Sequence, residues 1–124
     1  MVVSRTIAVV LSSATSSAAA ATALQLADRL LTAGHRVAIF AHGGAVQLAL
    51  ADGPIAAPAA ALLRRGVHGA TLDWVVESGA AGGRRLVDGV IAGDDADLWR
   101  FVREADVVLA PGGGQPWPVV SSAS

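Results

Sequence analysis

The sequence contains no cysteine and no lysine. Without cysteine, the chain cannot form a disulfide, a thiolate metal site or a cysteine nucleophile. All nine basic residues are arginines, and they face eight Asp and two Glu, so the formal net charge is −1. This near balance argues against a nucleic-acid-binding protein that relies on bulk charge, and against electrostatic anchoring to a membrane surface.

Long apolar runs are also missing, although 53% of the residues are hydrophobic and the mean hydropathy is +0.55. No run reaches the roughly 18 apolar residues that indicate a transmembrane helix. Near the N-terminus, Arg5 and the apolar segment Ile7–Leu11 loosely resemble a signal peptide. That apolar core is shorter than the roughly 7–15 residues of a signal peptide. We therefore expect a buried strand here, in a cytoplasmic protein without a membrane anchor.

Short apolar runs alternate with helical patterns through residues 1–110, which we expect to form one domain. The apolar runs predict strands at Thr6–Leu11, Arg36–Ala41, Thr71–Val76, Val87–Ala92 and Asp106–Ala110. Helical spacing predicts a helix that ends at Ala33, short turns at Ala45–Ala51, a helix at Ala59–Arg65 that Gly66 ends, and a last helix through Leu98–Ala105. Glu77–Gly83 is expected to be a loop and Pro111–Ser124 a flexible tail rich in Gly, Pro and Ser. The alternation predicts a flavodoxin- or Rossmann-like α/β fold: a three-layer α/β/α sandwich with a five-stranded, mainly parallel sheet.

Such a sheet binds ligands at the carboxyl ends of its strands. After the first strand, hydroxyl side chains gather where the first helix begins: Ser12, Ser13, Thr15 and Ser16. Together with the free N–H groups of a helix N-terminus, these hydroxyls would suit a small anion. The plainer interpretation is an ordinary Ser/Thr helix cap.

Two further strand ends carry candidate residues. His42 and Gly43 follow the second strand, and a histidine at this place would suit an acid or base, although it is more often a loop residue. Glu77 and Ser78 follow the third strand. A carboxyl group beside an apolar strand would suit a proton carrier. The plainer alternative for Glu77 is a salt bridge with Arg64, Arg65, Arg84 or Arg85.

Several common sites are not predicted. The chain has neither a G-x-G-x-x-G nor a G-x-x-x-x-G-K-[ST] sequence, so a dinucleotide cofactor or a P-loop is not expected. His35, His42 and His68 lack metal-ligand spacing, and we predict no metal site and no cofactor. Trp99, on the last helix beside its apolar stripe, is a candidate subunit-interface residue.

Two segments, IAVVLSS with ATALQLADRLLTAGHRVAIFAHGGAVQLAL and LVDGVIAGDDADLWRFVREADVVLA, resemble the opening and closing parts of the DsrE/DsrF/DsrH family of sulfur-relay proteins. The resemblance covers most of residues 6–110 and implies the family's fold, a cytoplasmic location and oligomer formation. In relay members, a cysteine carries a persulfide on the loop near strand three or just before an AAALRRG-like helix. The corresponding stretches here, 76–80 and 57–66, contain no cysteine. Sulfur transfer by this chain is therefore not implied.

Two functions follow as hypotheses. In the first, the chain is a non-catalytic DsrE-like subunit or binding module, in a homo-oligomer or in a hetero-oligomer with a related, cysteine-bearing subunit. In the second, it is an enzyme or binding protein for a small molecule or oxyanion, with the Ser, His and Glu residues at the strand ends lining its cleft.

Overall fold

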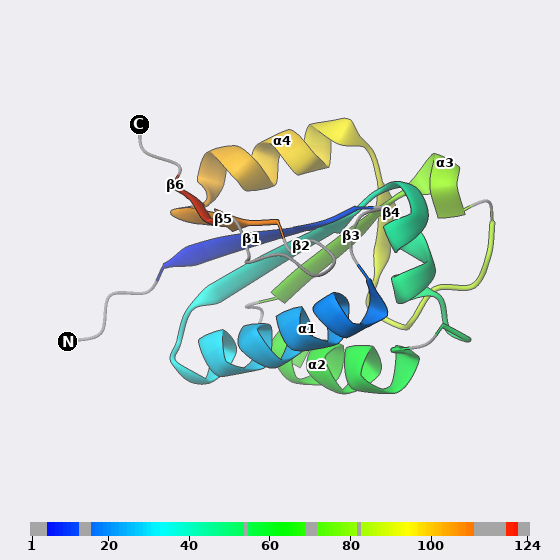
Figure 1. Ribbon diagram of the computed structural model, residues 1–124, viewed down its shortest axis with the longest axis horizontal. Helices are drawn as coiled ribbons and strands as arrows, with labels where there is room; N and C mark the ends of the chain where they lie inside the picture. Colours follow the sequence, from blue (N-terminus) through cyan, green and yellow to red (C-terminus); the bar gives the residue numbers. More distant parts are fainter. Residues whose placement is uncertain are drawn as a thin grey trace.

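A computed structural model describes residues 5–12, 16–53, 55–68, 72–81, 83–110 and 119–121 (Figure 1). The described strands are β1 Thr6–Leu11, β2 Arg36–Ala41, β3 Leu72–Glu77, β4 Ile91–Gly93, β5 Val107–Leu109 and β6 Val119–Ser121. The described helices are α1 Ser17–Thr32, α2 Ala56–His68, α3 Ser78–Ala81 and α4 Asp95–Glu104, with a 3₁₀ helix, η1, at Gly43–Ala49.

The strands form one sheet in the order β4-β3-β2-β1-β5-β6. β1 to β5 run parallel, and β6 pairs antiparallel with β5. The mainly parallel sheet is confirmed, with five parallel strands that follow the predicted order along the chain. β6 is an additional strand, and it lies in the segment that the sequence analysis expects to be a flexible tail. Its two valines have β propensity, and β5 offers an edge for them to pair with.

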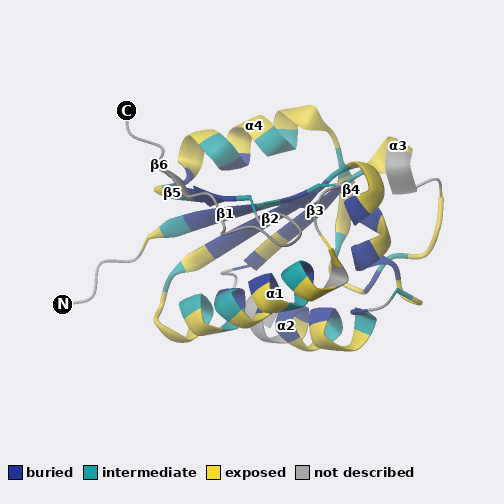
Figure 2. Cartoon of the chain, in the orientation of Figure 1, coloured by how far each residue is buried: buried dark blue, intermediate teal, exposed yellow. Residues whose placement is uncertain are grey.

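Helices cover both faces of the sheet, which confirms the three-layer sandwich (Figure 1). α1, α2 and η1 cover one face over a large apolar core, in which Trp74, Ile39 and Leu11 are almost fully buried. α4 packs on β1 and β2 at the other face over a smaller core that includes Phe40 and Phe101. Alternate residues of β1 and β2 belong to the two cores, so these strands are buried on both sides (Figure 2).

Some predicted boundaries are wrong. α2 begins at Ala56 and continues past Gly66 to His68, so Gly66 does not end it. Pro58 nevertheless lies in the first turn, where its missing N–H costs no helical hydrogen bond. A short helix, α3, replaces the loop predicted after β3.

The predicted fourth strand, Val87–Ala92, is wrong over most of its length, because a turn at residues 88–89 interrupts it and only Ile91 and Ala92 belong to β4. Gly89 has a φ of +100°, a left-handed turn that separates Leu86 from β4. Leu86 instead makes an isolated antiparallel bridge with Leu50. Leu86 and Val87 therefore pair with the segment around Leu50, whereas Ile91–Gly93 pair with β3.

Candidate functional site

The carboxyl ends of β1, β2 and β3 are tied together at one edge of the sheet. The backbone N–H of His42 donates to the carbonyl oxygen of Leu11 at 3.0 Å. The backbone N–H of Gly43 donates to Oε2 of Glu77 at 3.4 Å. Candidate residues that are 34 positions apart in sequence, Gly43 and Glu77, therefore meet at this edge.

Glu77 is the last residue of β3, and its side chain is half-buried. Its carboxylate lies against the N–H of the first residue of η1, where the backbone dipoles favour negative charge. In the described part of the chain, Glu77 forms no ion pair with Arg64, Arg84 or Arg85. The carboxylate therefore serves as a link between β3 and the segment that follows β2.

His42 occupies the N-cap position of η1 in extended backbone geometry, and its side chain makes no capping hydrogen bond. Its ring centroid lies 6.3 Å from that of Phe40, with a 37° angle between the ring planes. His42 is half-buried, whereas Gly43 and Ser78 are exposed. The imidazole therefore packs on the end of the smaller core with its remaining surface open to solvent.

The hydroxyl residues after β1 divide into two groups. Ser16 is the N-cap of α1, and its Oγ accepts from the N–H of Ala19 at 3.1 Å. This contact is the ordinary cap that was the plainer interpretation. Ser12 is half-buried directly after β1, while the candidates Ser13 and Thr15 lie outside the described residues.

The strand order also defines a topological switch point next to β1. The chain passes from β1 to β2 on one side, whereas β5 lies on the other side of β1. In open α/β sheets, ligands bind at such a switch point, outside the carboxyl ends of the two diverging strands. Here these ends are Leu11 and Leu109; residues 13–15 and 111–118, which follow them, lie outside the described residues. The glycines Gly112–Gly114 are among these residues outside the described part of the chain.

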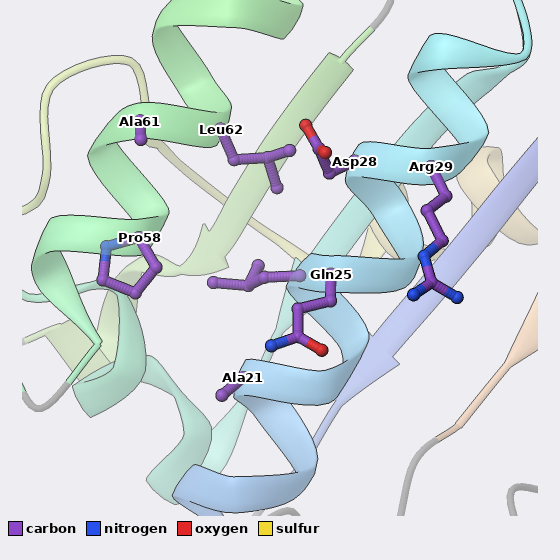
Figure 3. A pocket seen from close by; sticks show the side chains of 8 residues that line it. Ala21, Gln25, Asp28, Arg29, Pro58, Ala61 and Leu62 are labelled. Carbon is purple, nitrogen blue, oxygen red and sulfur yellow. The ribbon is translucent and has the colours of Figure 1, made fainter.

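A hollow of about 570 Å³ lies away from this edge, between α1 and α2 (Figure 3). Leu24 and Leu62 supply its apolar floor, and Gln25 and Arg29 line it from α1. It contains none of the candidate residues. Its apolar floor and open shape favour a shallow contact surface over a catalytic site.

Among the described residues, two large apolar side chains are exposed, and both lie on the side of the sheet that α4 covers. Trp99 on α4 is 62% exposed, and Ile91 on β4 is 59% exposed. Ile91 pairs in register with Val75, a member of the smaller core, so it points to the same face. In the described part of the chain, α4 packs mainly on β1 and β2, and Ile91 on the edge strand β4 stays largely exposed.

Within the described residues, no three His, Asp or Glu side chains gather in an arrangement that would hold a metal ion. No helix among them is long and apolar enough to cross a lipid bilayer.

Comparison with known proteins gives one result. Searches of curated proteins and of solved structures found no match. A family model, described as the DsrE/DsrF-like family, matches residues 5–109, which span β1 to β5 and include the strand-end residues described above. This match extends over most of the chain, and the protein belongs to the DsrE/DsrF-like family.

Proposed function

We propose that this protein is a non-catalytic subunit or binding module of a DsrE-like assembly. The observation that carries the proposal is a family fold in a chain without any cysteine. Persulfide transfer needs a thiolate sulfur, and no other side chain of this sequence supplies one. The chain keeps the scaffold of a sulfur carrier and lacks the atom that carries sulfur.

The contact of Glu77 gives this residue a structural role beside any chemical one. Among the titratable residues at the strand ends, Glu77 has its carboxylate engaged by the N–H of Gly43, which makes it a structural link. A general base needs a free acceptor oriented toward a substrate. The second carboxylate oxygen and the imidazole of His42 are the groups left for a reaction.

The side of the sheet covered by α4 is the surface we propose for association. Of the described helices, α4 covers this face, whereas α1, α2 and η1 cover the other (Figure 1). Trp99 and Ile91 both lie here, and exposed aromatic side chains are frequent anchors of protein interfaces. The partner is a second copy of the chain or a related, cysteine-bearing subunit.

The test is the mass of the native protein in solution. Light scattering and sedimentation at micromolar concentration should report an oligomer, and Trp99→Ala or Ile91→Ala should shift it toward the monomer. Gln47→Ala, an exposed position on η1, is the matched control and should leave the mass unchanged. A strict monomer that also captures no related subunit would overturn the proposal.

The meeting of three strand ends favours a second candidate function. Ser12, His42, Gly43, Glu77 and Ser78 lie at the edge where ligands of parallel sheets bind, and a small molecule or oxyanion would be their ligand. A thermal-shift panel of metabolites and oxyanions tests this alternative. A ligand-induced rise in melting temperature that His42→Ala and Glu77→Gln abolish would support it. If no compound raises the melting temperature, this alternative is rejected.

A cytoplasmic location is part of the proposal and rests on the family relation. Fractionation of the source cells, with detection of the native protein, is the direct test.

A further inference from the structure

Three arginines that the sequence analysis considered as partners of Glu77 lie elsewhere, around two adjoining hollows. Arg64 and Arg85 line a hollow of about 230 Å³, and Arg84 and Arg85 line a second one of about 430 Å³. Arg85 and Ala51 belong to both hollows. Arg85 thus lines both hollows, and the lining of each hollow includes a second arginine; all three arginines are exposed.

The backbone holds this cluster in place. The N–H of Ala51 donates to the carbonyl oxygen of Arg85 at 2.9 Å, and the N–H of Val87 donates to that of Ala49 at 2.8 Å. With the bridge between Leu50 and Leu86, these bonds pin the arginine segment to the end of η1. A pinned backbone lowers the conformational entropy that ligand binding would otherwise cost.

α2 forms the opposite wall of the first hollow. Ala56, Ala60 and Arg64 line it, and their spacing of four places them on one face of the helix. The two alanines leave the space that forms the hollow, and Arg64 brings a guanidinium to it. The wall therefore combines small side chains with one arginine.

The charges of the cluster are unbalanced. No described carboxylate lies within ion-pair distance of Arg64, Arg84 or Arg85; the ion pair among the described residues joins Arg100 and Asp97. Asp88 lines the first hollow and Asp52 the second, so three cations face two anions across the pair. The guanidinium groups thus keep their forked donors, which match the geometry of oxyanions.

We propose that these two hollows bind a small ligand with two linked tetrahedral oxyanion groups, one group in each hollow and both in contact with Arg85. The two aspartates at the rims accept hydrogen bonds from hydroxyl or protonated oxygens of the ligand. This site is separate from the strand-end residues and from the α4 side of the sheet, so it stands independently of the function proposed above.

Inorganic pyrophosphate is the probe, and titration calorimetry of the full chain at low ionic strength is the measurement. Orthophosphate, sulfate and thiosulfate are parallel arms that separate phosphorus from sulfur oxyanions and single groups from paired ones. Pyrophosphate should bind, and tighter than each single-group ion, because it alone among these probes offers one oxyanion group to each hollow.

Variants locate the site. Arg85→Gln should weaken pyrophosphate binding by about tenfold to hundredfold, since it removes charge-assisted hydrogen bonds to both groups. Arg64→Gln and Arg84→Gln should each weaken it by less. Arg36→Gln is the control: it removes the same charge from an exposed arginine at the start of β2, and should change the affinity by less than about twofold, because solvent screens distant charges. Thermal unfolding of each variant verifies that it is folded.

The proposal would be overturned by the absence of pyrophosphate binding, by equal losses in Arg36→Gln and Arg85→Gln, or by equal affinities for orthophosphate and pyrophosphate. Binding that His42→Ala abolishes while Arg85→Gln retains it would assign the ligand to the strand ends and likewise reject this site.

Discussion

The N-cap of α4 allows a quantitative test of the local structure that supports the proposed interface. Asp94 accepts from the N–H of Ala96 at 2.9 Å, and Asp97 reaches back to the N–H of Asp94 at 3.1 Å, which completes a capping box. Replacing an N-cap Asp by Ala typically costs about 1 kcal/mol. We expect Asp94→Ala to lower the free energy of unfolding by about this amount.

The corresponding shift in melting temperature follows from chain length. Unfolding entropy near the midpoint is about 2.1 cal/mol/K per residue, which gives about 0.26 kcal/mol/K for 124 residues. A loss of about 1 kcal/mol therefore lowers Tm by about 4 °C. Differential scanning calorimetry measures this shift, and urea titration gives the free energy of unfolding independently.

Two matched variants separate the cap from its charge. Asp94→Asn keeps the capping oxygen without the charge, and should retain most of the stability. Asp95→Ala removes a neighbouring first-turn carboxylate that does not cap the helix, so it loses only the smaller interaction with the helix dipole. If Asp95→Ala costs as much as Asp94→Ala, or if Asp94→Asn costs as much as Asp94→Ala, the capping argument is refuted.

Three further substitutions test the packing and the strand-end contact. A Cβ at Gly93 would overlap side-chain atoms of the capping box and of β3, so Gly93→Ala should cost about 1–3 kcal/mol by denaturant titration; Gly79→Ala, with open space around its Cβ, is the control and should not destabilise. The buried Nε1 of Trp74 has no hydrogen-bond partner among the described residues, so Trp74→Phe, which removes that donor, should cost less than about 2 kcal/mol, against about 3–5 for Trp74→Ala. Equal losses would mean that the indole N–H is satisfied. Glu77→Gln retains an oxygen for the N–H of Gly43 and should be nearly neutral, whereas Glu77→Ala should cost about 0.5–1.5 kcal/mol; equal costs for the two would contradict a hydrogen-bonding role.

Local patterns predicted the strands well where a single apolar run serves a single pairing. β1 and β2 begin and end where the sequence analysis placed them, because a strand buried on both faces is a continuous apolar run bounded by polar or turn residues. The strand predicted at Val87–Ala92 is wrong for the opposite reason. Its residues divide between the neighbourhood of Leu50 and the edge of β3, and only the tertiary structure places those partners.

The strand-end candidates show a similar division. Sequence order with the rule for parallel sheets places His42 and Glu77 at one edge. It does not say which group Glu77 contacts, because that depends on the path of the chain after β2. The structure gives the N–H of Gly43 as the partner. Of the four arginines considered for that role, Arg64, Arg84 and Arg85 form no ion pair with Glu77, and the side chain of Arg65 lies outside the described residues.

The amino-acid sequence by itself determined the α/β class, the bounds of the two central strands β1 and β2, and the absence of any thiol. These properties depend on composition and on periodicities within about ten residues, which short-range sterics and hydrogen bonding read directly. Only the tertiary structure decided that α4 covers one side of the sheet, that β6 adds a strand next to β5, and that Arg64 and Arg85 line one hollow. Those features join residues far apart in the chain, and the packing of helices on the sheet selects which of them meet.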